Sequence, residues 1–154
     1  MDPKSCLRWS TEDFDSMSWH DVHVHALRIE EREHGSGELI LDIDYILEWR
    51  AQGAAFVFRV APATLRFHGI SELRVALDYA SPSAGMCPFS LAGIAREVFT
   101  YPNGHETFRW LLTVNWPQGE IGFKSPGFTQ ELAGPEVVGP KQSLAPHERR
   151  RAGI

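Results

Sequence analysis

The chain of 154 residues contains little cysteine and no long apolar segment. Its two cysteines, Cys6 and Cys87, form neither a C-x-x-C pair nor a zinc-ligand spacing, so we expect two free thiols. No apolar run approaches the roughly 20 residues that cross a bilayer, and the first residues lack the apolar core of a signal peptide. These absences lead us to expect a cytoplasmic protein with no membrane partner.

Basic charge is also scarce. The formal net charge is −5 and the isoelectric point is about 5.8. A protein that binds nucleic acid non-specifically needs a basic face that displaces counterions from the phosphates, so we expect no nucleic-acid partner. The basic run Arg149-Arg150-Arg151 is interpreted as a solvated tail.

Familiar catalytic motifs are missing from the sequence as well. It has no G-x-S-x-G nucleophile elbow, no phosphate-binding loop and no dinucleotide fingerprint, and its glycines occur as turn residues. Ser16, Ser18 and Cys87 could pair with His20 or His23, but no neighbouring residues complete a nucleophilic site. The sequence therefore favours a protein that is not an enzyme, and it yields no catalytic residue.

What the chain does contain is a large aromatic complement and a repeated alternation of apolar and polar side chains. The aromatic residues are five Trp, three Tyr and nine Phe, and flat side chains pack well on pleated sheets. The alternation is typical of strands with one wet face and recurs over residues 21–31, 38–49, 56–60, 65–68, 73–79 and 108–116. Turn signals such as Tyr101-Pro102-Asn103-Gly104 separate these runs. We predict an all-β fold: a single-domain antiparallel barrel or sandwich of about 7–8 strands with at most one short helix.

The pattern divides the chain into three parts. Residues 1–18 are predicted to form an N-terminal arm, residues 19–130 the antiparallel β domain, and residues 131–154 a mostly irregular C-terminal tail. The packed face of the domain is expected to contain Leu27, Ile29, Leu41, Ile43, Phe58, Leu65, Phe67, Val75, Leu77, Trp110, Leu112 and Val114.

The pairing of the first two long strands is predicted from the same alternation. A five-residue loop at 33–37 pairs residue 32 with residue 38 and keeps apolar side chains opposite one another. The resulting neighbours are Ile29 with Leu41, Leu27 with Ile43, His25 with Tyr45, His23 with Leu47, Asp21 with Trp49 and, on the other face, Arg28 with Asp42.

The densest group of potential ligands and proton carriers is the segment Trp19-His20-Asp21-Val22-His23-Val24-His25. Side chains two residues apart on a strand share a face, so its carboxylate and two of its imidazoles can line one pocket. We predict a ligand-binding site lined by His20, Asp21, His23, His25, Tyr45 and Trp49. The sequence leaves open that these histidines are half-buried, hydrogen-bonded residues with a purely structural role.

Two imidazoles on one strand face could instead hold one divalent transition metal ion. The spacing His23-x-His25-x4-Glu30-x6-Gly37 resembles the first metal motif of the cupins, in which two His and one Glu bind a metal inside a double-stranded barrel. Pro102-Asn103-Gly104 is similar to part of the second cupin motif, but His105 follows it directly, and Met17 stands where the first motif has glycine. The resemblance implies a metal-binding barrel, or a metal-dependent enzyme, that uses His23 and His25. Apart from that alternative we expect no cofactor.

The acidic row Asp42, Asp44 and Glu48, with Glu30 nearby, is a second group of potential ligands. Oxygen-rich groups bind Ca²⁺ or Mg²⁺, but a flat strand face offers no loop to wrap around the ion. We interpret the row as a solvated outer face, whose charge also discourages aggregation.

The segment Ser18-Trp19-His20-Asp21, together with the run from Gly37 to Trp49, resembles small uncharacterised bacterial all-β proteins. The Trp-His-Asp start of the first strand is also similar to that of bacterial toxin-immunity proteins, which bind and neutralise toxins. The resemblance implies a cytosolic binding protein and carries no catalytic residue with it. We therefore expect a non-enzymatic module whose partner is another protein, with a homo-oligomer as an open alternative.

Overall fold

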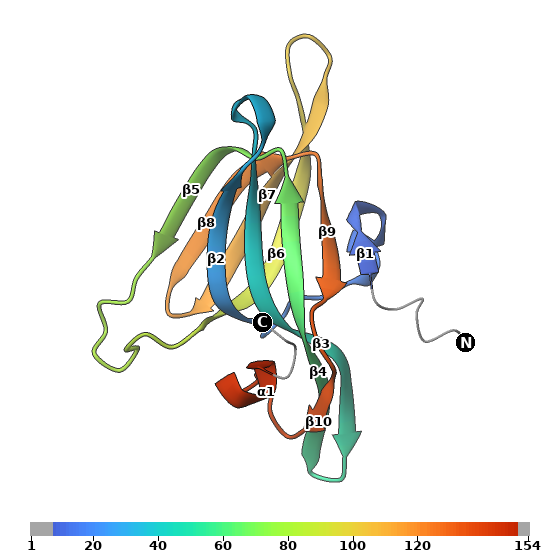
Figure 1. Ribbon diagram of the computed structural model, residues 1–154, viewed down its shortest axis with the longest axis vertical. Coiled ribbons are helices and arrows are strands. Elements are labelled where there is room, and N and C mark those ends of the chain that lie inside the picture. The colour runs from blue at the N-terminus through green and yellow to red at the C-terminus, as the bar shows by residue number, and fades with distance from the viewer. Residues whose placement is uncertain (1–7, 151–154) are drawn as a thin grey trace.

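The computed structural model describes residues 8–150, and it confirms the all-β class. Ten antiparallel strands form one hydrogen-bonded sheet in the order β1-β9-β4-β3-β2-β6-β7-β8-β5, with β10 paired to β4 (Figure 1). The strands are β1 (Arg8–Ser10), β2 (His23–Glu31), β3 (Gly37–Gln52), β4 (Ala55–His68), β5 (Ser71–Leu77), β6 (Phe89–Thr100), β7 (Glu106–Trp116), β8 (Gly119–Ser125), β9 (Gly127–Leu132) and β10 (Val137–Gly139). The helices are the five-residue α1 (Pro146–Arg150) and two 3-10 turns, Thr11–Ser16 and Glu33–Gly35. The strands beyond the predicted 7–8 include the two three-residue strands, β1 and β10.

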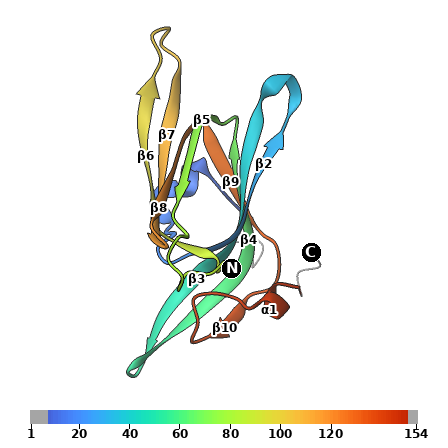
Figure 2. The same cartoon turned by 90° about the vertical axis from the view of Figure 1, so that its left-hand side faces the viewer.

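The sheet folds over itself into two layers without closing. One layer contains β2, β3, β4 and β9, and the other contains β6, β7, β8 and β5 (Figures 1 and 2). The layers are joined where β2 pairs with β6, a contact limited to His23↔Ser90 and Val24↔Phe89. The two layers move apart with increasing distance from this β2–β6 contact, as Figure 2 shows. Among residues 8–150, most of β2 therefore has no neighbouring strand on one side.

The core lies between the layers and is rich in aromatic rings. Phe67 meets Phe123 and Trp110 at centroid distances of 4.7 and 5.1 Å, both nearly edge to face, a geometry that aromatic pairs favour. The Trp110 indole N–H donates to the Ser125 carbonyl at 2.9 Å, so burial leaves that donor satisfied. Most of the predicted core residues are buried: Leu41, Ile43, Phe58, Leu65, Phe67, Trp110, Leu112 and Val114.

Two predicted core residues are on the surface instead. Ile29 is 65% exposed and Val75 is 43% exposed, while Leu27 and Leu77 are only partly buried. These residues belong to β2, which is largely unpaired on the β6 side, and to β5, which ends the sheet path. Alternation shows which side chains share a face, but it does not show whether a second layer covers that part of the face.

The β2–β3 register is shifted by two residues from the predicted one, while the last paired residues, Glu31 and Gly37, still enclose a five-residue loop. Ile29 pairs with Leu39 rather than Leu41, and the Arg32 N–H donates to the Ser36 carbonyl at 2.7 Å. The turn is tight because His34 and the glycine that follows it adopt φ values of 58° and 75°, in the left-handed region. A shift of two residues preserves the faces, and the predicted contact of Arg28 with Asp42 is present at 2.8 Å.

A β-bulge at His25 then changes the pairing at the start of β2. The register shifts between Val24 and Ala26, so that Val24 pairs with Ile43 and His23 with Asp44. The predicted pairings of His25 with Tyr45 and of His23 with Leu47 are therefore wrong. A bulge inserts one extra residue into a strand and re-aims its side chain, which no alternation pattern reveals.

Segments at both ends of the described chain pack against the sheet. β1 pairs with β9, and Phe14 of the first 3-10 turn stacks on Trp19 at a centroid distance of 5.6 Å. β10 pairs with β4, and the Leu144 side chain that follows it is buried. Cys87 is an exposed free thiol, whereas Cys6 and Arg151 lie outside the described residues. Within residues 8–150, no helix has the length and apolarity required to cross a membrane.

Candidate functional site

Three of the six predicted site residues meet at one end of the molecule. The His20 ring stacks on Trp49 with 6.1 Å between centroids and 22° between planes, and its Nε2 lies 3.5 Å from Asp21 Oδ2. His20 Nδ1 lies 3.2 Å from the Ala92 carbonyl, which can only accept, so Nδ1 carries a proton. Nε2 faces the carboxylate, and the imidazole is 61% exposed.

A turn just before β2 fixes these side chains. Asp21 adopts φ of 63°, and its N–H donates to the Leu91 carbonyl at 2.8 Å. Its two carboxylate oxygens accept from Asn115 Nδ2 at 3.2 Å and from Gln142 Nε2 at 3.0 Å. On the core side, the Trp19 indole donates to Gln130 at 2.8 Å. The hydrogen bonds of the Trp-His-Asp segment thus connect the start of β2 to β6, to β7 and to the C-terminal segment.

Exposed aromatic rings extend the site along the β3–β4 hairpin. Trp49 packs edge to face against Phe58 at 4.9 Å and against Phe56 at 6.3 Å. Phe58 is buried, but Trp49 and Phe56 are 45% and 55% exposed. We call His20, Trp49 and Phe56, with Phe58 beneath them, the aromatic patch. Such exposed rings can contact a ligand or a partner surface without rearrangement of the core.

Sequence reasoning missed the two phenylalanines of the aromatic patch, although a signal was present. The two residues Gly53-Ala54 connect β3 to β4, and Gly53 adopts φ of 64°. A hairpin drawn at this glycine places Gln52 opposite Ala55 and leads to the observed pairing of Trp49 with Phe58. Glycine as a turn signal, followed by alternating aromatic residues, would have been sufficient to predict that Phe58 pairs with Trp49.

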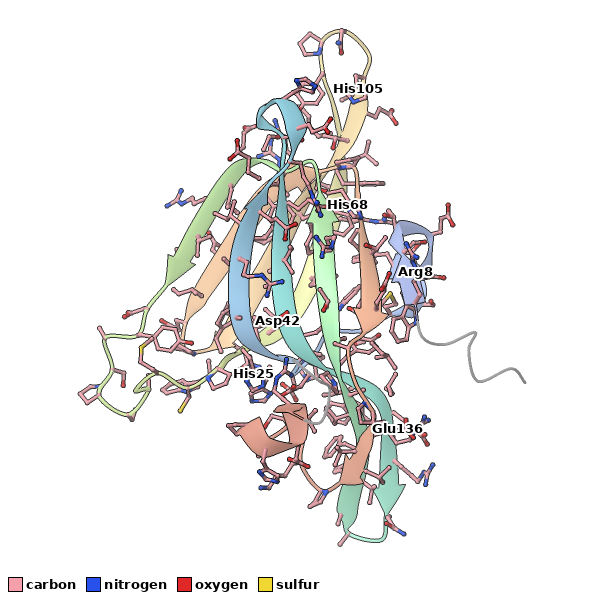
Figure 3. All side chains as sticks on the ribbon, in the orientation of Figure 1. Arg8, His25, Asp42, His68, His105 and Glu136 are labelled. Carbon is pink, nitrogen blue, oxygen red and sulfur yellow. The ribbon has the colours of Figure 1, made fainter. Side chains whose placement is uncertain are left out.

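His25 belongs to a different cluster, centred on the fully buried Asp44 side chain. Its Nε2–H donates to Asp44 Oδ2 at 2.6 Å, and the same oxygen accepts from the Leu144 N–H at 2.8 Å. Arg149 pairs with the other oxygen, Oδ1. We call these four residues the Asp44 cluster; Figure 3 shows His25 at the end of β2, next to the α1 segment that supplies the arginine.

The Asp44 cluster corrects two interpretations of the sequence. The Asp44 side chain is fully buried rather than part of a solvated acidic face. Arg149 is 14% exposed and ion-paired rather than part of a solvated tail. Both errors have one origin: a segment about a hundred residues away in sequence folds over β3, and local alternation carries no information about such a contact.

The remaining two predicted site residues lie apart from the aromatic patch. His23 is half-buried, with Nδ1 at 3.1 Å from the Asp21 carbonyl. Tyr45 is in the core between Trp9 and Trp19, at centroid distances of 5.1 and 6.4 Å. Burial raises the pKa of the Tyr45 phenol, against the opposing effect of a hydrogen bond with the Ser18 backbone. Ligand binding by the full set of six residues stays a prediction.

A second His–carboxylate pair lies at the other end of β3. Glu38 accepts from His68 Nδ1 at 2.5 Å, from Arg32 Nε at 2.6 Å and from Arg66 Nη1 at 3.0 Å. Burial acts to raise the pKa of the Glu38 carboxyl, but these hydrogen bonds together lower it to about 2. We call this group the Glu38 network; its three donors come from β4 and from Arg32, the residue that follows β2.

Within the described part of the chain, no three His, Cys, Asp or Glu side chains are grouped so that they could hold a metal ion. His23 and His25 have separate partners, the Asp21 backbone carbonyl and the Asp44 carboxylate, and Glu30 forms an ion pair with Arg32. A metal ion held by the two histidines stays a prediction that elemental analysis can test.

Comparison with known proteins finds no matching family model, no matching curated protein and no matching solved structure.

Proposed function

We propose that this protein is a non-enzymatic cytoplasmic module that binds another protein through the aromatic patch. The observation that carries the proposal is the exposure of Trp49 and Phe56 side by side on a projecting hairpin. Tryptophan and other aromatic residues dominate the energetics of protein interfaces, because each buries a large area with few rotatable bonds. The exposed half of the Trp49 side chain can be buried by a partner, so Trp49 is a strong anchor for a partner surface.

The hairpin that carries the patch is held rigidly. β3 and β4 pair from Leu39↔Phe67 to Gln52↔Ala55, with one irregularity. Arg59 donates to Glu48 at 2.9 Å and to Glu136 at 2.6 Å, which ties β3, β4 and the segment before β10 together. A surface that is already ordered loses little conformational entropy when it binds, so this rigidity favours affinity.

The partner class follows from the resemblance of the Trp19-His20-Asp21 segment to immunity proteins: we take the partner to be a protein toxin. In the structure, that segment supplies the rim of the patch, because His20 stacks on Trp49 while Trp19 anchors the turn in the core. This placement supports the proposal, since the residues that carry the resemblance border the surface that would bind.

The test begins with capture on the immobilised full chain from an extract of its own source cells, and the captured protein is then purified. Titration calorimetry with purified components should give a defined Kd, and Trp49→Ala should raise it by about tenfold or more. The matched control is Val98→Ala, a 60% exposed apolar residue on the β6–β7 hairpin at the opposite end of the molecule. Equal affinity of wild type and Trp49→Ala would refute this site.

A further inference from the structure

A groove of about 450 Å³ lies on the β6–β7–β8–β5 layer, on the face that points away from the core. Trp110 and Phe123 of these strands are buried in the core, so the residues that alternate with them face outward. Cross-strand pairing lines up four of these outward residues along the groove floor: Arg74, Gly122, Leu111 and Ala95. The groove lies on a different layer from the hairpin of the aromatic patch (Figure 2).

Glycine at position 122 is not explained by the fold. Gly122 lies inside β8 and its φ is outside the left-handed region, so its backbone suits any residue. A Cβ there would meet only the Trp110 carbonyl at 3.8 Å and Leu111 Cδ1 at 4.0 Å, which are ordinary contacts. By contrast, a Cβ at Gly119 would collide with the Ala76 carbonyl oxygen. Glycine inside a strand often marks a place where another molecule approaches closely, and at position 122 its effect is to keep the groove open.

The charges around the groove include cations that are incompletely paired. Lys124 is ion-paired with Glu72 and lies 3.6 Å from the Phe99 ring centroid. Arg109 is 50% exposed; its guanidinium forms a long ion pair of 3.8 Å with the exposed Glu97 carboxylate and lies 5.2 Å from the Phe99 ring centroid. Arg74 makes no ion pair with any residue in the described range 8–150, although it is exposed beside Gly122. The Arg74 guanidinium is therefore available to a ligand, and Arg109 adds positive charge nearby.

We infer that this groove is a second binding site, and that it takes an extended segment of a partner protein carrying an acidic side chain. The carboxylate pairs with Arg74 and is attracted by Arg109, because guanidinium groups form strong charge-assisted bonds with carboxylates. The neighbouring side chain of the segment lies over Gly122 and contacts Leu111, which is 39% exposed.

Two observations favour a protein segment over a nucleic acid or a small anion. β5 ends the sheet path and, within the described residues, pairs only with β8, so the groove is open on its Arg74 side and has room for an extended segment rather than for a small anion alone. Glu72 and Glu97 lie at opposite sides of the groove and repel a continuous phosphate backbone, as does the net charge of −5. A single acidic side chain avoids both carboxylates.

The experiment selects a displayed library of random short peptides on the full chain, with Gly122→Val as the counter-selection. Valine suits a strand, so this variant should keep its fold while its side chain fills the groove. Enriched peptides should carry Asp or Glu at one position. A synthetic copy should lose about tenfold or more in affinity when that residue is changed to Asn or Gln, or when the protein carries Arg74→Glu.

Arg74→Glu keeps the test valid if Gly122→Val does not fold, because it changes only an exposed charge. Trp49→Ala should bind the selected peptide as wild type does, which separates this site from the aromatic patch. The inference is overturned if no peptides are enriched, if the enriched peptides lack acidic residues, or if Arg74→Glu binds as tightly as wild type. Tighter binding of oligo-dT than of the peptide would also overturn it.

Discussion

Glu38 and Asp44 are two buried carboxylates on the same strand, and each bonds a histidine, yet they stabilise different parts of the fold. The Glu38 network lies within one hairpin and its neighbouring strand, since its partners are Arg32, Arg66 and His68. The Asp44 cluster instead bonds the C-terminal segment through Leu144 and Arg149. Figure 3 shows the labelled His68 and His25 at the two ends of this layer.

The difference lies in what each carboxylate joins. Glu38 neutralises cations that neighbouring strands would bring together in any case, so it reinforces contacts that the sheet already has. Asp44 is the shared acceptor for groups that are otherwise far apart in sequence, and its side chain has no exposed area at all. Loss of Asp44 therefore removes a long-range attachment, whereas loss of Glu38 weakens a local one.

The largest effect is expected from Asp44→Asn. The variant keeps the shape of the side chain but leaves the Arg149 guanidinium without its counter-charge, and should lower the free energy of unfolding by about 3 kcal/mol. Limited trypsin digestion should also cut the C-terminal segment at Lys141 or Arg149 faster than in wild type. The control is Asp42→Asn on the same strand; Asp42 is 27% exposed and pairs with Arg28, so it should cost less than about 1 kcal/mol. Equal losses in the two variants would contradict the comparison.

Glu38→Gln should have the next largest effect, about 2 kcal/mol at neutral pH after allowance for the exposure of its arginine partners. The pKa of Glu38 falls from 4.5 to about 2 on folding, so its stabilisation is complete above the unfolded pKa. It is lost as the pH falls through about 4.5 towards 2. Urea titrations of both proteins between about pH 7 and pH 3 should therefore show a difference in unfolding free energy that narrows at acid pH. A constant difference would mean that the carboxylate charge is not the cause.

The contrast between local contacts, as in the Glu38 network, and long-range contacts, as in the Asp44 cluster, also explains how much of the structure the sequence could predict. Alternation was sufficient for strands such as 108–116 and for core residues such as Ile43, because both depend on neighbours within a strand or hairpin. It also predicted the contact between Arg28 and Asp42, which survives a two-residue change of register.

Features that depend on a single irregular residue or on distant segments were not predictable in this way. The bulge at His25 and the left-handed conformation of His34 leave the residue pattern unchanged. The burial of Asp44 depends on Leu144 and Arg149, which lie in a stretch of low apolar density. For the candidate site, the stacking of His20 on Trp49 agrees with the predicted grouping of these residues, but the hairpin partner Phe56 was overlooked.

The smallest effect should come from His25→Gln, and it sharpens the division between the Asp44 cluster and the aromatic patch. The imidazole contributes one hydrogen bond to Asp44, with a partly exposed ring, so its loss should cost about 1 kcal/mol. Because His25 is not part of the patch, the variant should bind the purified partner with wild-type affinity. Trp49→Ala loses packing against Phe56 and Phe58, but unlike His25→Gln it should also raise the Kd strongly. Both quantities come from the same samples, by urea titration and calorimetry. If His25→Gln abolished binding while its stability stayed near wild type, the six residues from His20 to Trp49 would act as one ligand site, and a purely structural role for His25 would be wrong.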